Sequence, residues 1–258
     1  MAISTLSSVI KQVLPESAVA RLQLLDHWYR GEPELRLVSR VCDKARGAVD
    51  VGANIGTYTA LMRKHAASVV AYEPNPRLAE RLARLYSDVR VRSAAVSDAP
   101  GTLTLSIPVK SGTSVHELGS VAQNFADEAD VQRVTVPAVR LDDENLGDVG
   151  FLKIDAEQHE REVLNGALGM IQRCRPVIMT EATPLLYADG LAEHFRFLTD
   201  LGYQGAFTFR GRILPMQEFR SETHANAAEF GQGNFMNPNV FFIPAERTLV
   251  EVFGSERT

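Results

Sequence analysis

The feature that most constrains the fold is a short apolar run at residues 48–51 that ends directly in a loop from Gly52 to Gly56. An amphipathic stretch follows at 55–66, so the pattern predicts a buried strand, a tight turn and a helix. Other apolar runs alternate with helical patterns in the same way, at residues 69–73, 151–155 and 176–181. This alternation predicts βαβ units, and therefore an α/β fold with a mostly parallel, doubly wound sheet.

The remaining segments complete this architecture. Residues 1–45 read as two or three helices that cap the domain, and the helix at 17–29 places Val19, Leu22, Leu25 and Trp28 on one face. Residues 89–96 read as a third strand. Alternating apolar and polar residues predict an inserted antiparallel hairpin at 102–107 and 132–139, with a loop or lid at 109–130 between its strands. We expect the last strands at 203–209 and 239–243, separated by an irregular stretch at 211–238.

Composition narrows the function classes. The chain has 258 residues and a net charge of −5, so we expect a single domain, with the cap at 1–45 and the core at 46–258. A protein that binds nucleic acid normally presents a basic face, so we expect no nucleic-acid partner. The chain shows no cationic leader, no apolar run long enough to span a bilayer and only two cysteines. These features predict a cytoplasmic protein without a membrane span.

The glycine spacing of the loop after the first strand indicates what it can bind. A dinucleotide fingerprint needs Gly-x-Gly-x-x-Gly, but Asn54 stands at the second glycine. A phosphate-binding P-loop is excluded because no Gly-Lys-Ser/Thr follows. The pattern Asp50-x-Gly52-x-x-x-Gly56 instead suits a ligand that carries an ammonium and a carboxylate, such as the amino-acid end of methionine. A plain tight turn is the structural alternative.

Glu73 ends the second predicted strand, at the edge where ligands of doubly wound sheets bind. A carboxylate there can accept hydrogen bonds from both hydroxyls of a ribose. A strand-end acid can also simply cap the next helix. Its place in the same βαβ unit as the glycine loop favours the ribose interpretation.

Taken together, these motifs resemble the FkbM-type methyltransferase family over about residues 47–182. The resemblance is carried by residues 50–56, Glu73-Pro74-Asn75, residues 94–98, Leu152 to Glu157, and the Glu160-x-x-Val163-Leu164-x-Gly166-Ala167 pattern. It implies a seven-stranded class I methyltransferase sheet, a Rossmann-like fold that binds S-adenosylmethionine. It also implies O-methylation of a hydroxyl on a saccharide or a polyketide-like small molecule.

The resemblance also implies a cofactor site. Asp50, Gly52, Asn54 and Gly56 would surround the methionine part, Glu73 the ribose, and Ala95 the adenine. The full set of expected cofactor-binding residues is Asp50, Gly52, Ala53, Asn54, Gly56, Tyr58, Glu73, Pro74, Asn75, Ala95 and Asp155. The family commonly has Asp-x-Glu-Gly after its fourth strand, whereas Gln158 replaces that glycine here. This departure puts the shape of the acceptor pocket in question.

Methylating an alcohol requires that its proton be removed, either by a general base or with a metal that acidifies the hydroxyl. The candidate catalytic residues are Asp155, Glu157, His159 and Glu181. Glu157 or His159 would be the base of a metal-free reaction. Asp155 and Glu181 end adjacent strands, so they would bind Mg²⁺ in a metal-dependent one. Each has a structural alternative, such as a helix cap for Asp155 and a solvated residue for His159.

Two other functions remain open from the sequence. One is a nicotinamide-dependent oxidoreductase on a Rossmann-like fold, against which Asn54 argues. The other is a non-catalytic cofactor-binding module, against which the joint presence of Asp50, Glu73 and Asp155 argues. Neither the acceptor nor the oligomeric state is encoded in a motif.

Overall fold

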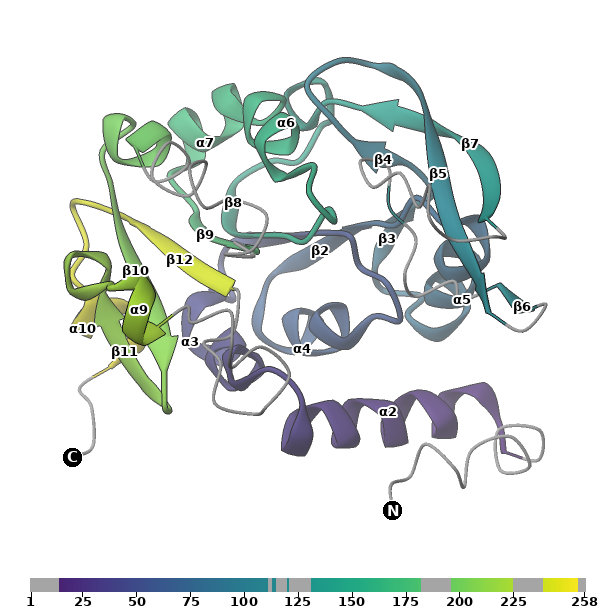
Figure 1. Cartoon of the computed structure of the whole chain (residues 1–258), viewed down its shortest axis with the longest axis horizontal. Coiled ribbons are helices and arrows are strands. Elements are labelled where there is room, and N and C mark those ends of the chain that lie inside the picture. Colours follow the sequence, from purple (N-terminus) through teal and green to yellow (C-terminus); the bar gives the residue numbers. More distant parts are fainter. Residues whose placement is uncertain are drawn as a thin grey trace.

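A computed structural model describes residues 14–110, 113–114, 120, 131–181, 196–224 and 239–254. Its centre is an eight-stranded sheet in the order β11-β10-β12-β9-β8-β1-β2-β3 (Figure 1). The strands of this sheet are β1 (Gly47–Val51), β2 (Ser68–Tyr72), β3 (Arg90–Arg92), β8 (Val149–Ile154), β9 (Val177–Glu181), β10 (Tyr203–Phe209), β11 (Arg212–Pro215) and β12 (Asn239–Pro244).

Strand direction confirms most of the expected architecture. The neighbours from β3 through β2, β1 and β8 to β9 are all parallel, whereas β12 is antiparallel to both β9 and β10. The prediction of seven strands is wrong by one, because β11 adds an eighth at the edge. It lies in the segment that we expected to be irregular, and it pairs antiparallel with β10. The turn between them places Arg210 and Gly211 at φ 50° and 78°, which is typical of a two-residue hairpin.

Helices cover both faces of the sheet. The two cores on either side show that α6 and α7 pack on one face, and that α3, α4, α5 and α10 pack on the other. The helices are α2 (Glu16–Arg30), η1 (Pro33–Leu37), α3 (Val38–Val41), α4 (Thr57–His65), α5 (Pro76–Leu85), η3 (Leu141–Asp143), α6 (Glu160–Asn165), α7 (Leu168–Cys174), η4 (Met216–Glu218), α9 (Ser221–His224) and α10 (Leu249–Phe253). In the described part of the chain, no helix is long and apolar enough to cross a membrane.

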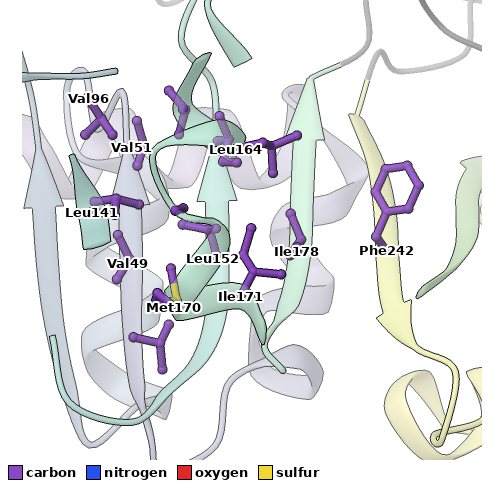
Figure 2. Close-up of a cluster of buried hydrophobic side chains, with 14 of the residues drawn as sticks. Val49, Val51, Val96, Leu141, Leu152, Leu164, Met170, Ile171, Ile178 and Phe242 are labelled. Atoms are coloured by element: carbon purple, nitrogen blue, oxygen red, sulfur yellow. The ribbon is translucent and has the colours of Figure 1, made fainter. Parts of the chain in front are cut away.

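The core beneath α6 and α7 shows how the strands are held in place (Figure 2). Val49 and Val51 of β1 and Leu152 of β8 alternate toward this face, where Leu164 and Ile171 cover them. All five side chains are buried. Burying aliphatic side chains of this size stabilises the fold by about 1.5–3 kcal/mol each. The opposite face of β1 and β8 is therefore free to carry polar residues toward α4.

The inserted hairpin forms a sheet of its own. Strands β4 (Ala95–Val96), β5 (Gly101–Lys110), β6 (Thr113–Ser114) and β7 (Val131–Val139) pair in the order β4-β7-β5-β6. The antiparallel pair β5–β7 confirms the prediction from alternating polarity. The single strand expected at 89–96 is instead divided, with β3 in the large sheet and β4 in the small one. Most of the expected lid at 109–130 lies outside the described residues.

Two helix predictions need correction. In α2 the face toward the protein carries Ala20, Leu24 and Trp28, whereas Leu22 and Leu25 are about half exposed at 47% and 52%. The single helix expected after β8 is divided into α6 and α7. Gly166 separates them, because its carbonyl accepts a hydrogen bond from Asp142 N and a Cβ there would lie 2.0 Å from the carbonyl oxygen of Ser97.

Candidate active site

Two adjoining pockets lie at the carboxyl ends of β1, β2 and β8. The first is narrow, about 50 Å³, and lies between the ends of β1 and β2, the segment 94–96 and the loop after β8. The second is wider, about 510 Å³, and lies between the glycine loop and the end of α2. Gly52, Asn54 and Asp155 line both pockets. The glycine loop and the start of the loop after β8 therefore form the junction between them.

The backbone of the glycine loop explains its sequence. Gly52 has a φ of 73°, and a Cβ at this position would lie 1.7 Å from the carbonyl oxygen of Asp155. Only glycine permits both that conformation and that approach. Asn54 also has a positive φ, 52°, which asparagine tolerates better than most residues. Gly56 precedes α4 as its N-cap residue with a φ of 88°, and a Cβ built on it would face Leu82 and Tyr86 instead of a pocket.

Glu73 is buried in the wall of the first pocket. Its Oε2 accepts a hydrogen bond from Asn54 N at 2.7 Å, and its Oε1 accepts one from Asn75 N at 2.8 Å. Burial raises the pKa of Glu73 to about 7, although these two backbone N–H groups act in the opposite direction. A carboxylate has about four acceptor positions. Each oxygen thus keeps a lone pair for a hydroxyl of a ligand in the pocket.

A buried lysine joins the two strands that end at the junction. Lys153 of β8 pairs in register with Asp50 of β1 and lies 3.7 Å from its Oδ1 and 3.0 Å from Asp155 Oδ2. The ring centroid of Tyr58 lies 4.9 Å from its Nζ. Burial would lower the pKa of Lys153, but the carboxylates of Asp155, Asp50 and Glu32 raise it above its usual value. Lys153 is therefore a fixed positive charge beneath the glycine loop.

Glu157 lies in the loop between β8 and α6 and lines the first pocket together with Asp155. Burial and the neighbouring carboxylates of Asp155 and Glu160 raise the pKa of Glu157 to about 7. Glu157 and Gln158 have φ values of 51° and 78°. The family's glycine at position 158 thus corresponds to a left-handed backbone, which glycine adopts without strain. The departure at Gln158 leaves this turn in place, and Gln158 N donates to Glu160 Oε1 at 3.1 Å.

The other two catalytic candidates lie outside both pockets. The ring Nε2 of His159 is 2.9 Å from Ser97 Oγ, at the start of α6. Glu181 ends β9, where its Cα pairs with that of Asn239 in β12. Among the described residues there is no cluster of three or more His, Cys, Asp or Glu side chains that could hold a metal. The Mg²⁺ site expected at Asp155 and Glu181 is therefore not supported, and Asp155 has Lys153 as its cationic partner.

The residues expected at the cofactor fall into two groups, those that line a pocket and those that do not. Those that line one or both pockets are Gly52, Ala53, Asn54, Tyr58, Glu73, Pro74, Ala95 and Asp155. Asp50 is fully buried and accepts a hydrogen bond from Thr59 Oγ1 at 2.5 Å. Asn75 caps α5, where its Oδ1 accepts from Arg77 N at 3.1 Å. Asp50, Gly56 and Asn75 thus support the residues that line the pockets without lining a pocket themselves.

No sequence motif points to Glu32, which lies before the first predicted strand. Its Oε2 accepts from Tyr58 OH at 2.5 Å and from Asn239 Nδ2 at 3.0 Å. It lines the second pocket, beside Lys153 and Asp155. Only the fold brings together these three residues, Glu32, Tyr58 and Asn239, which are far apart in the sequence. A hydrophobic or polar pattern around Glu32 alone could not have identified it.

Comparison with known proteins agrees with this geometry. The sequence profile described as the methyltransferase FkbM domain matches residues 50–204, more than half of the chain. The hexuronic acid methyltransferase AglP of Haloferax volcanii is 31% identical over 159 residues, which cover 58% of this chain and 62% of that protein. This chain therefore matches less than two thirds of that relative's length.

A solved structure shares the fold. The crystal structure of methyltransferase FkbM from Methylobacillus flagellatus KT matches with a TM-score of 0.50 and 15% sequence identity. The match covers 89% of this chain and 55% of that one. At this identity the likeness concerns the fold alone. The profile match includes Gly52, Asn54 and Asp155, which form the junction of the two pockets, and Glu73 in the wall of the first pocket. The chain belongs to the methyltransferase FkbM domain family.

Proposed function

We propose that this chain is an S-adenosylmethionine-dependent O-methyltransferase that acts on a hydroxyl of a saccharide. The observation that carries the proposal is the pair of pockets that meet at Gly52, Asn54 and Asp155, in a chain of the FkbM family. One pocket presents a buried carboxylate, and the other opens toward the end of α2. A donor and an acceptor can therefore meet at a single junction.

The first pocket suits an adenosine group. Glu73 would accept hydrogen bonds from the two ribose hydroxyls on the lone pairs that its backbone partners leave free. Ala94, Ala95 and Leu78 provide an apolar wall for the adenine. The left-handed turn of the glycine loop at Gly52 and Asn54 would leave room for the methionine part at the junction of the two pockets. Each of these residues fits the cofactor by its chemistry as well as by its position.

When bound, S-adenosylmethionine supplies a methyl group on a positively charged sulfur. Catalysis by the protein then consists of aligning the acceptor oxygen with that methyl group and removing the hydroxyl proton. We assign proton removal to Glu157, whose pKa of about 7 suits a general base at neutral pH. Asp155, at the junction and fixed by Lys153, would orient the acceptor hydroxyl. Glu157 would take the hydroxyl proton while the methyl group leaves the sulfonium sulfur for the acceptor oxygen, and the cofactor would be left as a neutral thioether.

Two observations favour a saccharide as the acceptor. The second pocket is lined by polar side chains that can hydrogen-bond to hydroxyl groups, among them Gln23, His27 and Glu32. The named activity of the Haloferax volcanii relative is the methylation of a sugar acid. A polyketide-like acceptor would present fewer hydroxyl groups to such a wall.

The test is a product screen with the purified chain. Mono- and disaccharide glycosides are incubated with S-adenosylmethionine, and products are analysed by mass spectrometry for the roughly 14-dalton gain of a methyl group. Fragmentation of a methylated product assigns the methyl to oxygen. Methylation of polyketide-like alcohols but not of glycosides would overturn the saccharide assignment. Transfer to nitrogen or carbon would overturn the O-methylation assignment.

A further inference from the structure

The second pocket is lined by more carboxylates than Lys and Arg side chains. Its carboxylates are Asp26, Glu32 and Asp155, and its cations are Arg30 and Lys153. Each cation already has a carboxylate partner: Arg30 lies 3.7 Å from Asp26, and Lys153 lies 3.0 Å from Asp155. Lys153 also faces the buried Asp50. Among the described carboxylates that line this pocket, Glu32 is therefore the one that forms no ion pair with a Lys or Arg.

Glu32 is held in place by neutral groups. Its Oε2 accepts from the hydroxyl of Tyr58 and from the side-chain amide of Asn239. Within the described part of the chain, no Lys or Arg forms an ion pair with Glu32. Its negative charge is close enough to Lys153 to raise the pKa of that residue. The pocket beside the methyl-transfer junction is thus negative overall.

The described lining of the second pocket offers no compensating charge. Apart from Arg30 and Lys153, which are already paired, it contains no Lys or Arg. A carboxylate or phosphate on the acceptor would therefore meet Glu32 and Asp155 without an unpaired cation in this lining, and juxtaposed like charges reduce affinity.

We propose that the acceptor is an uncharged or amino-bearing sugar, and that Glu32 excludes acceptors that carry a carboxylate or phosphate near the methylated hydroxyl. This proposal rests on the saccharide function proposed above, and it separates this chain from its hexuronic acid-methylating relative. The unpaired carboxylate would also favour the sulfonium charge of the donor over the neutral thioether product.

The first experiment compares three alkyl glycosides that differ only at C6, which carries a hydroxymethyl, a carboxylate or an aminomethyl group. We expect kcat/KM for the glucuronide to be at least tenfold below kcat/KM for the neutral glucoside. For the amino sugar, kcat/KM should equal or exceed the value for the glucoside. Glu32→Gln should raise the ratio of kcat/KM for the glucuronide to kcat/KM for the glucoside by about fivefold or more. Glu80→Gln, which removes an exposed carboxylate on α5, should leave the ratio unchanged. Preference for the glucuronide in the wild type would overturn the proposal.

The second experiment does not depend on the acceptor. Calorimetry measures the affinities of S-adenosylmethionine and S-adenosylhomocysteine for the wild type and Glu32→Gln. Loss of the negative charge should weaken binding of the sulfonium form at least threefold more than binding of the thioether form. An unchanged ratio would overturn the role of Glu32. If this ratio shifts while none of the glycosides is methylated, the saccharide function fails but the charge selectivity of the pocket stands.

Discussion

Lys153 shows how a single residue can couple two loops of the site. It lies in β8 with 3% of its surface exposed, opposite the fully buried Asp50 of β1. Its ammonium also reaches Asp155, which begins the loop after β8. Removing one partner of a buried ion pair leaves the other charge uncompensated, and this costs more than the pair itself contributes.

We therefore expect Lys153→Met to lower the free energy of unfolding by about 3–5 kcal/mol, measured by urea denaturation. Adding Asp50→Asn to this variant should restore part of the loss, because the unpaired buried charge is then removed. Lys44→Met, at an exposed position, should change stability by less than about 0.5 kcal/mol. A loss below about 1 kcal/mol for Lys153→Met would show that Lys153 does not stabilise the junction.

Glu157 leads to a prediction about pH. A general base must be ionised, so kcat should rise as pH increases through about 7, the raised pKa of Glu157. Below that pH, activity should fall about tenfold for each pH unit. Glu157→Gln should lower kcat by about 10²–10⁴-fold and remove this inflection. His159→Asn should retain the inflection, because His159 lies outside both pockets beside Ser97. If His159→Asn removes it, histidine is the base.

At the scale of elements, the turn from β1 to α4 places the glycine loop against the loop after β8. Gly52 N donates to the carbonyl of Tyr72, and Asp155 N donates to the carbonyl of Val51. These bonds connect the ends of three neighbouring strands. The glycine at position 52 is thus required by packing between loops as well as by its own φ.

Gly52→Ala should therefore destabilise the protein more than an alanine at another positive-φ glycine. Gly147 is the matched control, since its φ is 69° and no atom lies within 4 Å of a Cβ built there. Backbone strain alone costs about 1–2 kcal/mol at such a position. We expect Gly147→Ala to show that cost, and Gly52→Ala to exceed it by at least about 2 kcal/mol in denaturant unfolding and to weaken cofactor binding. Equal losses would mean that the loops can separate without cost.

The sequence predicted these elements unevenly, and the reasons are physical. Periodicity and glycine spacing identified β1, α4 and β2, because their signals lie within one contiguous stretch. The hairpin β10–β11 was missed, because Arg210 occupies a left-handed turn position where asparagine or glycine is usual. The break between α6 and α7 was missed as well. It depends on the contact of Gly166 with Ser97, which is distant in the sequence.

At the scale of the whole molecule, the parallel sheet brings the ends of β1, β2 and β8 to one edge, so their polar residues could be assigned to one site in advance. Glu32 and Asn239 could not, since they come from segments before and after the family's matched region and meet only through tertiary packing. Sequence motifs thus predict the first pocket better than the second. The first pocket is built from local turns, and the second from distant segments.

We propose that the pocket walled by Glu73 and Gly52 binds S-adenosylmethionine. The most direct test of this assignment is calorimetric titration of the purified chain with S-adenosylmethionine and, separately, with NADH. We predict one S-adenosylmethionine bound per chain, no binding of NADH, and a 10–100-fold weaker affinity in Glu73→Ala, which corresponds to the roughly 1.4–2.7 kcal/mol of charge-assisted hydrogen bonds. Glu80→Ala should match the wild type. Binding of NADH instead, or an affinity for S-adenosylmethionine unchanged by Glu73→Ala, would contradict this account of the site.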